Sequence, residues 1–525
     1  MDYEDVPPSV NFIPCVKWVK KGVAKEIPEK IELSKEELQD IISQTKSELS
    51  TVEEEEDNEN TGTPENPVTS VSDEYNFDKY DEEDTKPDAL LGIGNLAVYS
   101  NESGDPYVTL NQNENESDDD SEKEDDKINP RDNLILVGHV EVDASILEVY
   151  VYNEEEGTLY VHHDLLLPAY PLCIEWLNHD PIERKPGNLC AIGSMSPVID
   201  VWDIDIVDCL EPAFKLGHRG NKKKGISKYG HRDAVLDLSW NSNMTHIIAS
   251  GSADQTVLLW DLDSRKFASS LTSFQEKVQT LQWHPFEGQT LLVGSCDRVA
   301  RVFDCRVEDA HRDWTVPGEV ERVQWNHFSP FNFLVGTSTG SIHHIDCRTD
   351  APLWELSAHS KEITGLALSS QCPGLLMTTG ADGSQKTWDI LDGSPSLVYE
   401  HKQKLGTLLC LDACPDLPFV ACIGGDNKNH NFCVVDLMEY SGVKHRFANR
   451  ELMQAIKSEE EEVESAEESS AMETADAMFE SLSLDTSDQP QPSTSTVTMK
   501  NFQSSGLKNK EKAFGGKKKK FKKKK

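Results

Sequence analysis

Several features common in other protein classes are missing from this 525-residue sequence. It has no run of about 18 consecutive apolar residues, so we expect no membrane-spanning helix. Its N-terminus has neither the positive segment nor the apolar core of a signal peptide, so we expect no secretion. The twelve cysteines form no C-x-x-C pair, and the nearest two are Cys410 and Cys414. This scatter favours reduced, buried thiols in a cytosolic or nuclear protein over a zinc site.

Positive charge is scarce except at one end of the chain. The formal net charge is −42, yet residues 508–525 hold eleven lysines and one glutamate. Residues 1–507 therefore carry about −52, which argues against non-specific nucleic-acid binding by the whole surface. An acidic body with a basic tail favours basic partners, such as histones or ribosomal proteins.

Between residues 131 and 447 the sequence repeats itself. One column of apolar–Asp pairs recurs at intervals of 58, 43, 42, 43 and 47 residues: Trp202-Asp203, Trp260-Asp261, Phe303-Asp304, Ile345-Asp346, Trp388-Asp389 and Val435-Asp436. A second column lies upstream: Trp176, Trp240, Trp283, Trp325 and Leu368. In the central four repeats the two columns stand 20 residues apart. A fixed period of this length indicates a repeat fold.

Each repeat contains strand-like segments. In the repeat that ends at Asp261, apolar residues alternate over 235–240, and two further apolar runs cover 247–250 and 257–260. An aspartate recurs six residues before the apolar residue of the apolar–Asp pair, at Asp254, Asp297 and Asp382. Aspartate in a tight turn bonds the backbone amides that the turn leaves free.

These residues resemble the WD-repeat family, whose blades carry G-H…D…W-D signatures. Gly230-His231 matches fully and Ala358-His359 matches in part, each histidine 29 residues before its tryptophan. The resemblance implies two buried hydrogen-bond networks within blades. One would contain His231, Asp254 and Trp260, and the other His359, Asp382 and Trp388. The Ser or Thr partner usual in the family is not identified in either repeat.

The fold class is therefore all-β, a seven-bladed WD-repeat β-propeller with disordered acidic arms and a short N-terminal helix. Six blades follow from the tryptophan column. The hairpin at 146–164 supplies the seventh, with His162-His163 where Trp-Asp would stand. We expect a strand from the N-terminal part to complete the blade that holds the last C-terminal strands. Ser34 and Glu37 form a capping box for a helix at 35–49.

The expected domains follow from composition shifts. They are an N-terminal strand and helix segment (1–52), an acidic disordered linker (53–88), the propeller (89–447, its blades mainly 131–447, with an acidic loop 111–130 inserted), an acidic, Ser-rich disordered region (448–500) and a basic polylysine tail (501–525). Residues 89–110 are expected to form a hairpin.

A second resemblance lies in the N-terminal block PCVKWVKKGVAKEIPEKIELSKEELQDII, before an acidic insert and the repeats. It is similar to the periodic tryptophan proteins, over about residues 14–447. That resemblance implies a nuclear and nucleolar factor in ribosome production that acts at ribosomal RNA genes and their chromatin.

The repeat also accounts for the polar residues that could suggest catalysis. Histidine, aspartate and serine stand where the repeat uses them to join strands, so we expect no enzyme and no cofactor. His343 and His344 lack acidic or cysteine partners at ligand spacing, so we expect no metal.

Three further features are candidates for binding, modification and targeting. A basic loop at 217–231 could contact phosphate or an acidic peptide, or merely neutralise the acidic arms; its residues are Arg219, Lys222, Lys223, Lys224 and Lys228. Four serines with an acid three residues on fit an acid-directed kinase: Ser117, Ser121, Ser458 and Ser465. The tail fits a nuclear or nucleolar import signal with loose attraction for RNA: Lys517, Lys518, Lys519, Lys520, Lys522, Lys523, Lys524 and Lys525.

Two functions follow from these expectations. The first is a non-catalytic scaffold in the nucleus and nucleolus for ribosome biogenesis and ribosomal RNA gene transcription, associated with chromatin. The alternative is a histone-binding chromatin reader or chaperone. The expected partners are proteins of ribosome assembly or ribosomal RNA transcription and histones, and no membrane.

Overall fold

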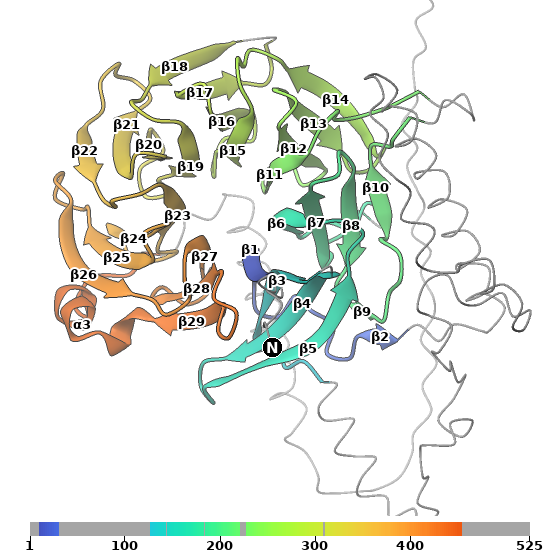
Figure 1. Ribbon diagram of the computed structural model, residues 1–525, viewed down its shortest axis with the longest axis horizontal. Helices are drawn as coiled ribbons and strands as arrows, with labels where there is room; N and C mark the ends of the chain where they lie inside the picture. The colour runs from blue at the N-terminus through green and yellow to red at the C-terminus, as the bar shows by residue number, and fades with distance from the viewer. Residues whose placement is uncertain are drawn as a thin grey trace, which may run out of the picture. The chain divides into compact units, whose positions relative to one another are not determined.

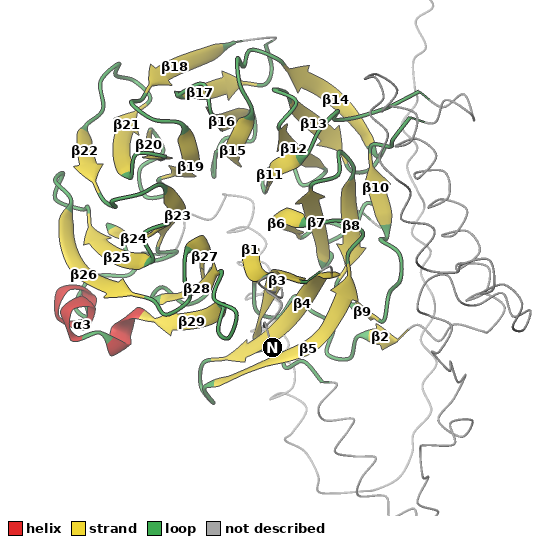
Figure 2. Cartoon of the chain, in the orientation of Figure 1, coloured by secondary structure: helices red, strands yellow, loops and turns green. Residues whose placement is uncertain are grey.

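Seven antiparallel β-sheets stand around a central axis as the blades of a propeller (Figure 1). The computed structural model describes residues 10–30, 127–142, 144–182, 184–220, 227–307 and 310–453. Strands make up nearly all the regular structure of these residues, and one short α-helix follows the last blade (Figure 2). The predicted seven-bladed β-propeller is confirmed.

Six blades have four strands and the seventh has three. From the innermost strand outward, blades 1 and 2 consist of β1 (Asn11–Val19), β3 (Asn133–Glu141), β4 (Ala144–Asn153) and β5 (Thr158–Leu166), then β6 (Pro171–Leu177), β7 (Leu189–Ser194), β8 (Ile199–Asp203) and β10 (Phe214–Leu216). Blades 3 and 4 consist of β11 (Val235–Trp240), β12 (Ile247–Ser252), β13 (Val257–Asp261) and β14 (Lys266–Leu271), then β15 (Val278–Trp283), β16 (Thr290–Ser295), β17 (Val299–Asp304) and β18 (His311–Thr315).

Blades 5 and 6 consist of β19 (Val320–Trp325), β20 (Asn332–Thr337), β21 (Ser341–Asp346) and β22 (Trp354–Ser357), then β23 (Ile363–Leu368), β24 (Leu375–Gly380), β25 (Ser384–Asp389) and β26 (Ser396–Lys402). Blade 7 has β27 (Leu408–Ala413), β28 (Val420–Gly425) and β29 (Phe432–Asp436). A short parallel ribbon joins β2 (Glu29–Lys30) to β9 (Ile206–Val207).

The hydrophobic core lies between neighbouring blades. One cluster joins Leu136 and Val149 of blade 1 to Trp176, Ile192 and Trp202 of blade 2. Because the sheet of each blade packs against a neighbouring blade on both faces, strands β12, β16 and β20 are buried along nearly their whole length. Packing on both faces explains why these strands read as continuous apolar runs rather than as strict alternation.

The N-terminal strand does not join the last blade, so that prediction is wrong. β1 pairs antiparallel with β3 and is the innermost strand of blade 1. Blade 7 contacts it across the blade interface, where the Trp18 backbone N–H donates to Asp412 Oδ2 (2.9 Å) and the Trp18 indole Nε1 donates to the Asp412 carbonyl (3.2 Å). The ring therefore closes through side chains and packing between blades 7 and 1.

The position assigned to His162-His163 is also wrong. The Trp-Asp pairs of blades 2, 3 and 6 end the third strand of their sheets. In blade 1 the third strand is β4, which ends at Tyr152-Asn153, whereas both histidines lie on the outermost strand β5. Tyr152 packs edge-on against Trp18 at 5.6 Å, so an aromatic residue does occupy the expected place.

After blade 7 the chain forms a 3₁₀ turn (η5, Leu437–Glu439) and the helix α3 (Ser441–Phe447). The helix contacts β26 and buries Val443 and Phe447. The last described residue is Met453, whose N–H donates to the Gln371 carbonyl of blade 6 (2.8 Å). The helix predicted at 35–49, the hairpin at 89–110 and the acidic blocks at 53–88, 111–126 and 454–500 lie outside the described residues. Within the described part of the chain, no helix has the length and apolar character of a membrane span.

Candidate binding sites of the propeller

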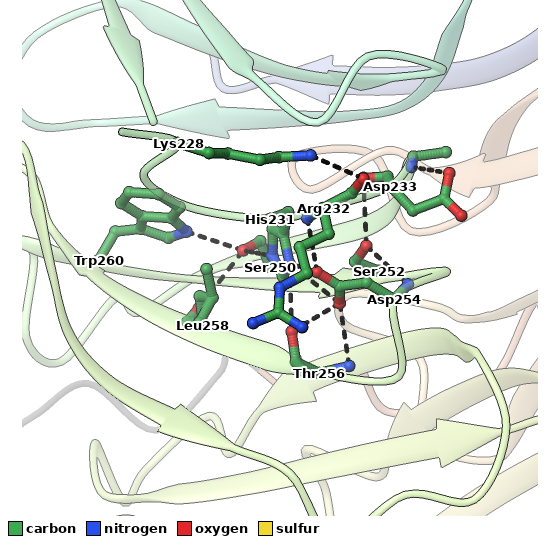
Figure 3. A network of polar contacts seen from close by, with 11 residues as sticks. Lys228, His231, Arg232, Asp233, Ser250, Ser252, Asp254, Thr256, Leu258 and Trp260 are labelled. Atoms are coloured by element: carbon green, nitrogen blue, oxygen red, sulfur yellow. Dashed lines mark hydrogen bonds and ion pairs between the residues drawn. The ribbon is translucent and has the colours of Figure 1, made fainter. Parts of the chain in front are cut away.

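The first predicted network is present in blade 3, centred on a serine. Ser250 Oγ lies 2.7 Å from His231 Nε2 and accepts a hydrogen bond from Trp260 Nε1 at 2.8 Å. Figure 3 shows the indole of Trp260 and the imidazole of His231 both directed at Ser250. On its other side, His231 Nδ1 lies 3.2 Å from Asp254 Oδ2. The His231 side chain is fully buried and that of Asp254 is 7% exposed.

Asp254 is held by three further groups of the turn and strand around it. Its carboxylate accepts from the Arg232 N–H (2.7 Å), the Thr256 N–H (3.1 Å) and the Thr256 hydroxyl (2.6 Å). Burial by itself raises the pKa of Asp254, but the hydrogen bonds from His231 and Thr256 outweigh it and hold the pKa well below its usual value. The carboxylate therefore stays ionised and fixes both ends of the turn.

Blade 6 repeats the arrangement with threonine at the centre. Thr378 Oγ1 lies 2.8 Å from His359 Nε2 and accepts from Trp388 Nε1 at 3.0 Å. His359 Nδ1 lies 3.2 Å from Asp382 Oδ1, which also accepts from the Ser384 hydroxyl at 2.6 Å. The predicted histidine, aspartate and tryptophan are thus brought together in both blades.

Sequence reasoning missed the hydroxyl that joins each network. Ser250 and Thr378 stand ten residues before their tryptophans, on the neighbouring strand of the sheet. Pairing of β12 with β13 places Ser250 opposite Leu258, close to the indole. A signal existed in the shared ten-residue offset, but the role of the hydroxyl depends on how the two strands pair.

Asp297 keeps the same turn position in blade 4 but has another partner. No histidine faces it; instead, Arg301 donates from NH2 at 2.8 Å, and both side chains are about 95% buried. The Arg301 guanidinium also lies over the ring of Phe274 at 5.3 Å, and Phe274 stands where blades 3 and 6 have histidine. An arginine–aspartate pair therefore replaces the histidine network in this blade.

These networks use up the polar atoms that could serve catalysis. Both ring nitrogens of His231 and of His359 lie within hydrogen-bond distance of protein side chains. Each set links a loop, a turn and two strands of one blade. A buried hydrogen-bond network whose groups are all paired makes such an arrangement rigid. Their contribution is to the stability of the blade.

The basic loop is only partly described. Arg219 NH2 donates to Ser196 Oγ at 3.3 Å, and Lys228 Nζ donates to the Arg232 carbonyl at 2.9 Å. Tyr229 stacks on Phe267 at 4.7 Å, and its hydroxyl accepts from the Phe267 N–H at 3.0 Å. The described part of the loop is therefore anchored to blades 2 and 3. Other predicted residues lie outside the described ranges: Lys222, Lys223, Lys224, Ser117, Ser121, Ser458, Ser465 and the lysines of 517–525.

A polar channel runs through the centre of the propeller, and its walls are the innermost strands. The cavity has a volume of about 180 Å³. Trp18 on β1 and Ala413 on β27 take the corresponding second-column positions of blades 1 and 7. In every blade except blade 6, the residue before the second-column position lines the cavity: Lys17, Glu175, Ser239, Gln282, Gln324 and Asp412. These side chains connect neighbouring blades, since Glu175 Oε1 accepts from the Trp240 N–H (3.0 Å) and Ser239 Oγ accepts from the Trp283 N–H (3.1 Å).

The channel contains five charged groups that the sequence analysis did not identify. Lys17 Nζ lies 2.6 Å from Glu175 Oε2. Burial lowers the pKa of Lys17, but the carboxylates of Glu175 and Asp412 outweigh it and raise the pKa above its usual value. Burial raises the pKa of both Asp237 and Asp412. With Arg322 as the second cation, the channel lining has three acidic and two basic side chains, so it is acidic overall.

Three cysteines line the channel at matching positions of blades 7, 1 and 2. Cys15, Cys173 and Cys410 each stand three residues before the second-column position of their strand. Burial raises the pKa of Cys15 and Cys173 well above the ordinary value and that of Cys410 to about 12. A Cβ added to Gly424 would lie 2.6 Å from Cys410 Sγ, so the thiol fills the space that this glycine leaves.

We expect these three thiols to resist alkylation in the folded protein. For Cys410, a pKa of about 12 in place of the ordinary 9 leaves roughly a thousandfold less thiolate, which is the reactive form. With iodoacetamide at pH 8, followed by peptide mass spectrometry, Cys209 should react before the channel cysteines, because it is only partly buried. The channel cysteines should react only in denaturant. Modification of Cys410 at the rate of Cys209 without unfolding would contradict this.

Trp18 is a further residue that sequence reasoning missed. It is the second-column tryptophan of blade 1, and its indole contacts the preceding blade as those of Trp283 and Trp325 do. The signal was the motif C-x-x-W, which occurs as Cys15-Val-Lys-Trp18 and again as Cys173-Ile-Glu-Trp176. Residues 19–172 separate the two copies, so the period of the other repeats does not reveal them.

Comparison with known proteins agrees with this geometry. Residues 223–261 match the family described as WD domain, G-beta repeat. The chain is 42% identical over 442 residues to periodic tryptophan protein 1 homolog of Drosophila melanogaster, covering 80% of this chain and 93% of that protein. It is 31% identical to periodic tryptophan protein 1 of Saccharomyces cerevisiae, covering 86% and 91%. A partial match, 24% identical over 40% of this chain and 50% of the other, is to ribosome biogenesis protein WDR12 homolog of Drosophila yakuba. The chain belongs to the periodic tryptophan protein 1 family of WD-repeat proteins.

Proposed function

We propose that the chain is a non-catalytic scaffold in the nucleus and nucleolus that supports ribosome biogenesis and ribosomal RNA gene transcription at chromatin. One observation carries the proposal: the His, Asp and Trp sets of blades 3 and 6 are hydrogen-bonded within the blades, so the ring offers its faces for contacts with other proteins. A rigid ring of this kind can hold several partners at once.

Three further observations support the cellular setting. A WD-repeat relative, matched over part of its length, is named as a ribosome biogenesis protein. The acidic excess of residues 1–507 suits partners that are basic, as ribosomal proteins and histones are. The lysine-rich residues 508–525 suit an import signal and a loose contact with RNA.

The alternative proposal is a histone-binding chromatin reader or chaperone. It is favoured by the same acidic excess and by the three carboxylates of the channel, Glu175, Asp237 and Asp412. Carboxylates in a narrow, partly desolvated opening attract lysine and arginine side chains of a partner more strongly than carboxylates on open surface.

Affinity purification of the full chain from nuclear extract, with and without nuclease, separates the two proposals. A fragment beginning at residue 131 is unsuitable, because it lacks the inner strand β1 of blade 1. Nuclease-resistant recovery of ribosome-assembly proteins would support the scaffold. Recovery of histones without such proteins would support the alternative and contradict the scaffold.

Deletion of residues 508–525 tests the targeting role separately. We expect nucleolar enrichment, measured by fluorescence microscopy of the tagged chain, to fall at least severalfold while the propeller stays folded. Replacement of the acidic segment 457–465 by a Gly/Ser sequence of equal length serves as the control for loss of a charged tail segment. Unchanged nucleolar enrichment after deletion of residues 508–525 would show that the localisation signal lies elsewhere in the chain.

A further inference from the structure

A pocket of about 450 Å³ lies between blades 5 and 6, away from the channel and the blade networks. We call it the 5–6 pocket. It lies where β19 ends, β20 and β22 begin and the β23–β24 and β25–β26 turns approach from the next blade. Its apolar wall consists of Phe328, Leu353, Leu368, Pro373, Ile390 and Leu391. This volume is within the range of pockets that hold a ligand or a large side chain.

Four buried polar atoms of the pocket's lining residues have no hydrogen-bond partner within the protein. They are Asn332 Oδ1, Trp354 Nε1 and both ring nitrogens of His344. The His344 residue is 7% exposed, and its ring lies 4.9 Å from the indole of Trp354. Buried polar groups in native proteins are nearly always paired, and each unpaired group costs about 1–3 kcal/mol. Four such atoms in one lining therefore indicate a ligand with complementary groups.

The unpaired atoms define the chemistry of that ligand. Burial lowers the pKa of His344 to about 4, so its imidazole is neutral at pH 7 and offers one donor and one acceptor. With the Trp354 N–H and the Asn332 oxygen, the lining offers two donors and two acceptors. A peptide group presents one N–H and one carbonyl, so two consecutive peptide groups match the set.

The lining also excludes charged ligands. None of the residues that line the 5–6 pocket carries a charged side chain. A lysine, arginine, carboxylate or phosphate placed there would lose its hydration without gaining a counter-charge. Large apolar side chains are favoured instead, and the pocket rim presents Leu353 and Leu391, which are 51% and 53% exposed.

We propose that the 5–6 pocket binds a short uncharged peptide segment of a partner protein, with one bulky apolar side chain in the pocket and its flanking peptide groups on Asn332, His344 and Trp354. This inference rests on the proposed scaffold function and names one of its docking sites. The chain's own segment after residue 453 is a poor occupant, because only QAIK precedes the acid-rich sequence SEEEEVESAEE of residues 458–468.

The test uses the full chain and a displayed library of random nine-residue peptides. The library is selected on the wild type, on Leu391→Glu, which places a charge in the pocket rim, and on Leu397→Glu. Leu397 is the matched control, a leucine of β26 that is 48% exposed and lies outside the pocket lining. Circular dichroism melting verifies that each variant folds.

We expect enrichment on the wild type and on Leu397→Glu but not on Leu391→Glu, with selected peptides sharing one Leu, Ile, Met, Phe or Trp without charged neighbours. A synthetic selected peptide should bind Trp354→Phe about tenfold more weakly, because the indole N–H is lost while the ring remains. Equal enrichment on Leu391→Glu, a consensus rich in charged residues, or unchanged binding to Trp354→Phe would overturn the proposal.

Two further results separate this proposal from neighbouring ones. If deletion of residues 457–525 raises the affinity for the selected peptide tenfold or more, the pocket binds the chain's own tail, and the assignment to a partner is wrong. If the full chain recovers ribosome-assembly proteins but selects no peptide at the 5–6 pocket, the proposed scaffold function is supported and the proposed peptide binding by the pocket is wrong. If a peptide is selected at the 5–6 pocket but no ribosome-assembly proteins are recovered, peptide binding by the pocket is supported and the scaffold function in ribosome assembly is overturned.

Discussion

Asp254→Ala is expected to lower the free energy of unfolding by about 3–5 kcal/mol, because each hydrogen bond to a buried charged group contributes about 1.5–3 kcal/mol and several donors lose their acceptor together. The substitution deprives His231, Thr256 and the Arg232 amide of their acceptor inside blade 3. The tryptophan–serine–histidine set then loses its anchor at the turn. Denaturant unfolding followed by tryptophan fluorescence measures the change.

The same carboxylate makes stability depend on pH. Because the pKa of Asp254 in the folded protein lies below the unfolded value of about 3.9, its contribution is fully present above that value. It is lost as the pH falls through the folded pKa. Hydrogen bonds from Ser384 and His359 also hold the pKa of Asp382 below its usual value, so its contribution to stability is lost in the same direction as the pH falls. Below pH 4 the wild type should therefore lose stability faster than Asp254→Ala does.

Asp350→Ala is the matched control, since Asp350 forms an ion pair with Arg312 but its side chain is 98% exposed. We expect a small change, because exposed pairs contribute little. If Asp254→Ala were no more destabilising than Asp350→Ala, the blade network would not be holding the turn.

Asp389→Ala is expected to release the C-terminal helix and to cost about 3 kcal/mol, the low end for a broken buried ion pair. The Asp389 side chain is 1% exposed and accepts from Arg446 Nε (2.5 Å), Arg450 NH2 (2.6 Å) and Arg450 NH1 (2.9 Å). Removing it leaves the largely buried Arg450 without its counter-charge. It also weakens the docking of α3, which buries Phe447.

Limited trypsin digestion measures the release directly. The rate of cleavage after Lys444, Arg446 and Arg450 should rise at least tenfold in Asp389→Ala. Asp304→Ala is the matched control, because Asp304 holds the equivalent position in blade 4 but pairs with the exposed Arg306. Faster cleavage in both variants, or in neither, would mean that Asp389 does not clamp the helix.

The two arginines that bind Asp389, Arg446 and Arg450, help to explain why blade 7 can end with three strands. The other blades cover their third strand with a fourth, whereas after β29 the chain turns through η5 into α3. Tyr440, at the start of the helix, stacks on Tyr399 of β26 at 4.1 Å. Arg450, after the helix, forms an ion pair with Asp389 of blade 6. Blade 6 therefore anchors the C-terminal end of the described chain.

Some of this architecture is legible in the residues alone. The spacing of Trp260, Phe303, Ile345 and Trp388 gives the period, and alternation within each unit gives the strands. The aspartates at 254, 297 and 382 mark the turns. These signals are local, since a strand's apolar pattern and a turn's acceptor are set by neighbours within a few residues.

The residues alone were enough to predict the repeat, the all-β class and the histidine, aspartate and tryptophan of two blade networks. The contacts that required the folded ring are the place of β1 in blade 1, the completion of the networks by Ser250 and Thr378, the pairing of Lys17 with Glu175 of the neighbouring blade, and the four unpaired polar atoms between blades 5 and 6. The reason is physical. A strand's pattern states which face is buried but not which strand lies beside it, and each of these contacts joins segments whose proximity depends on closure of the ring.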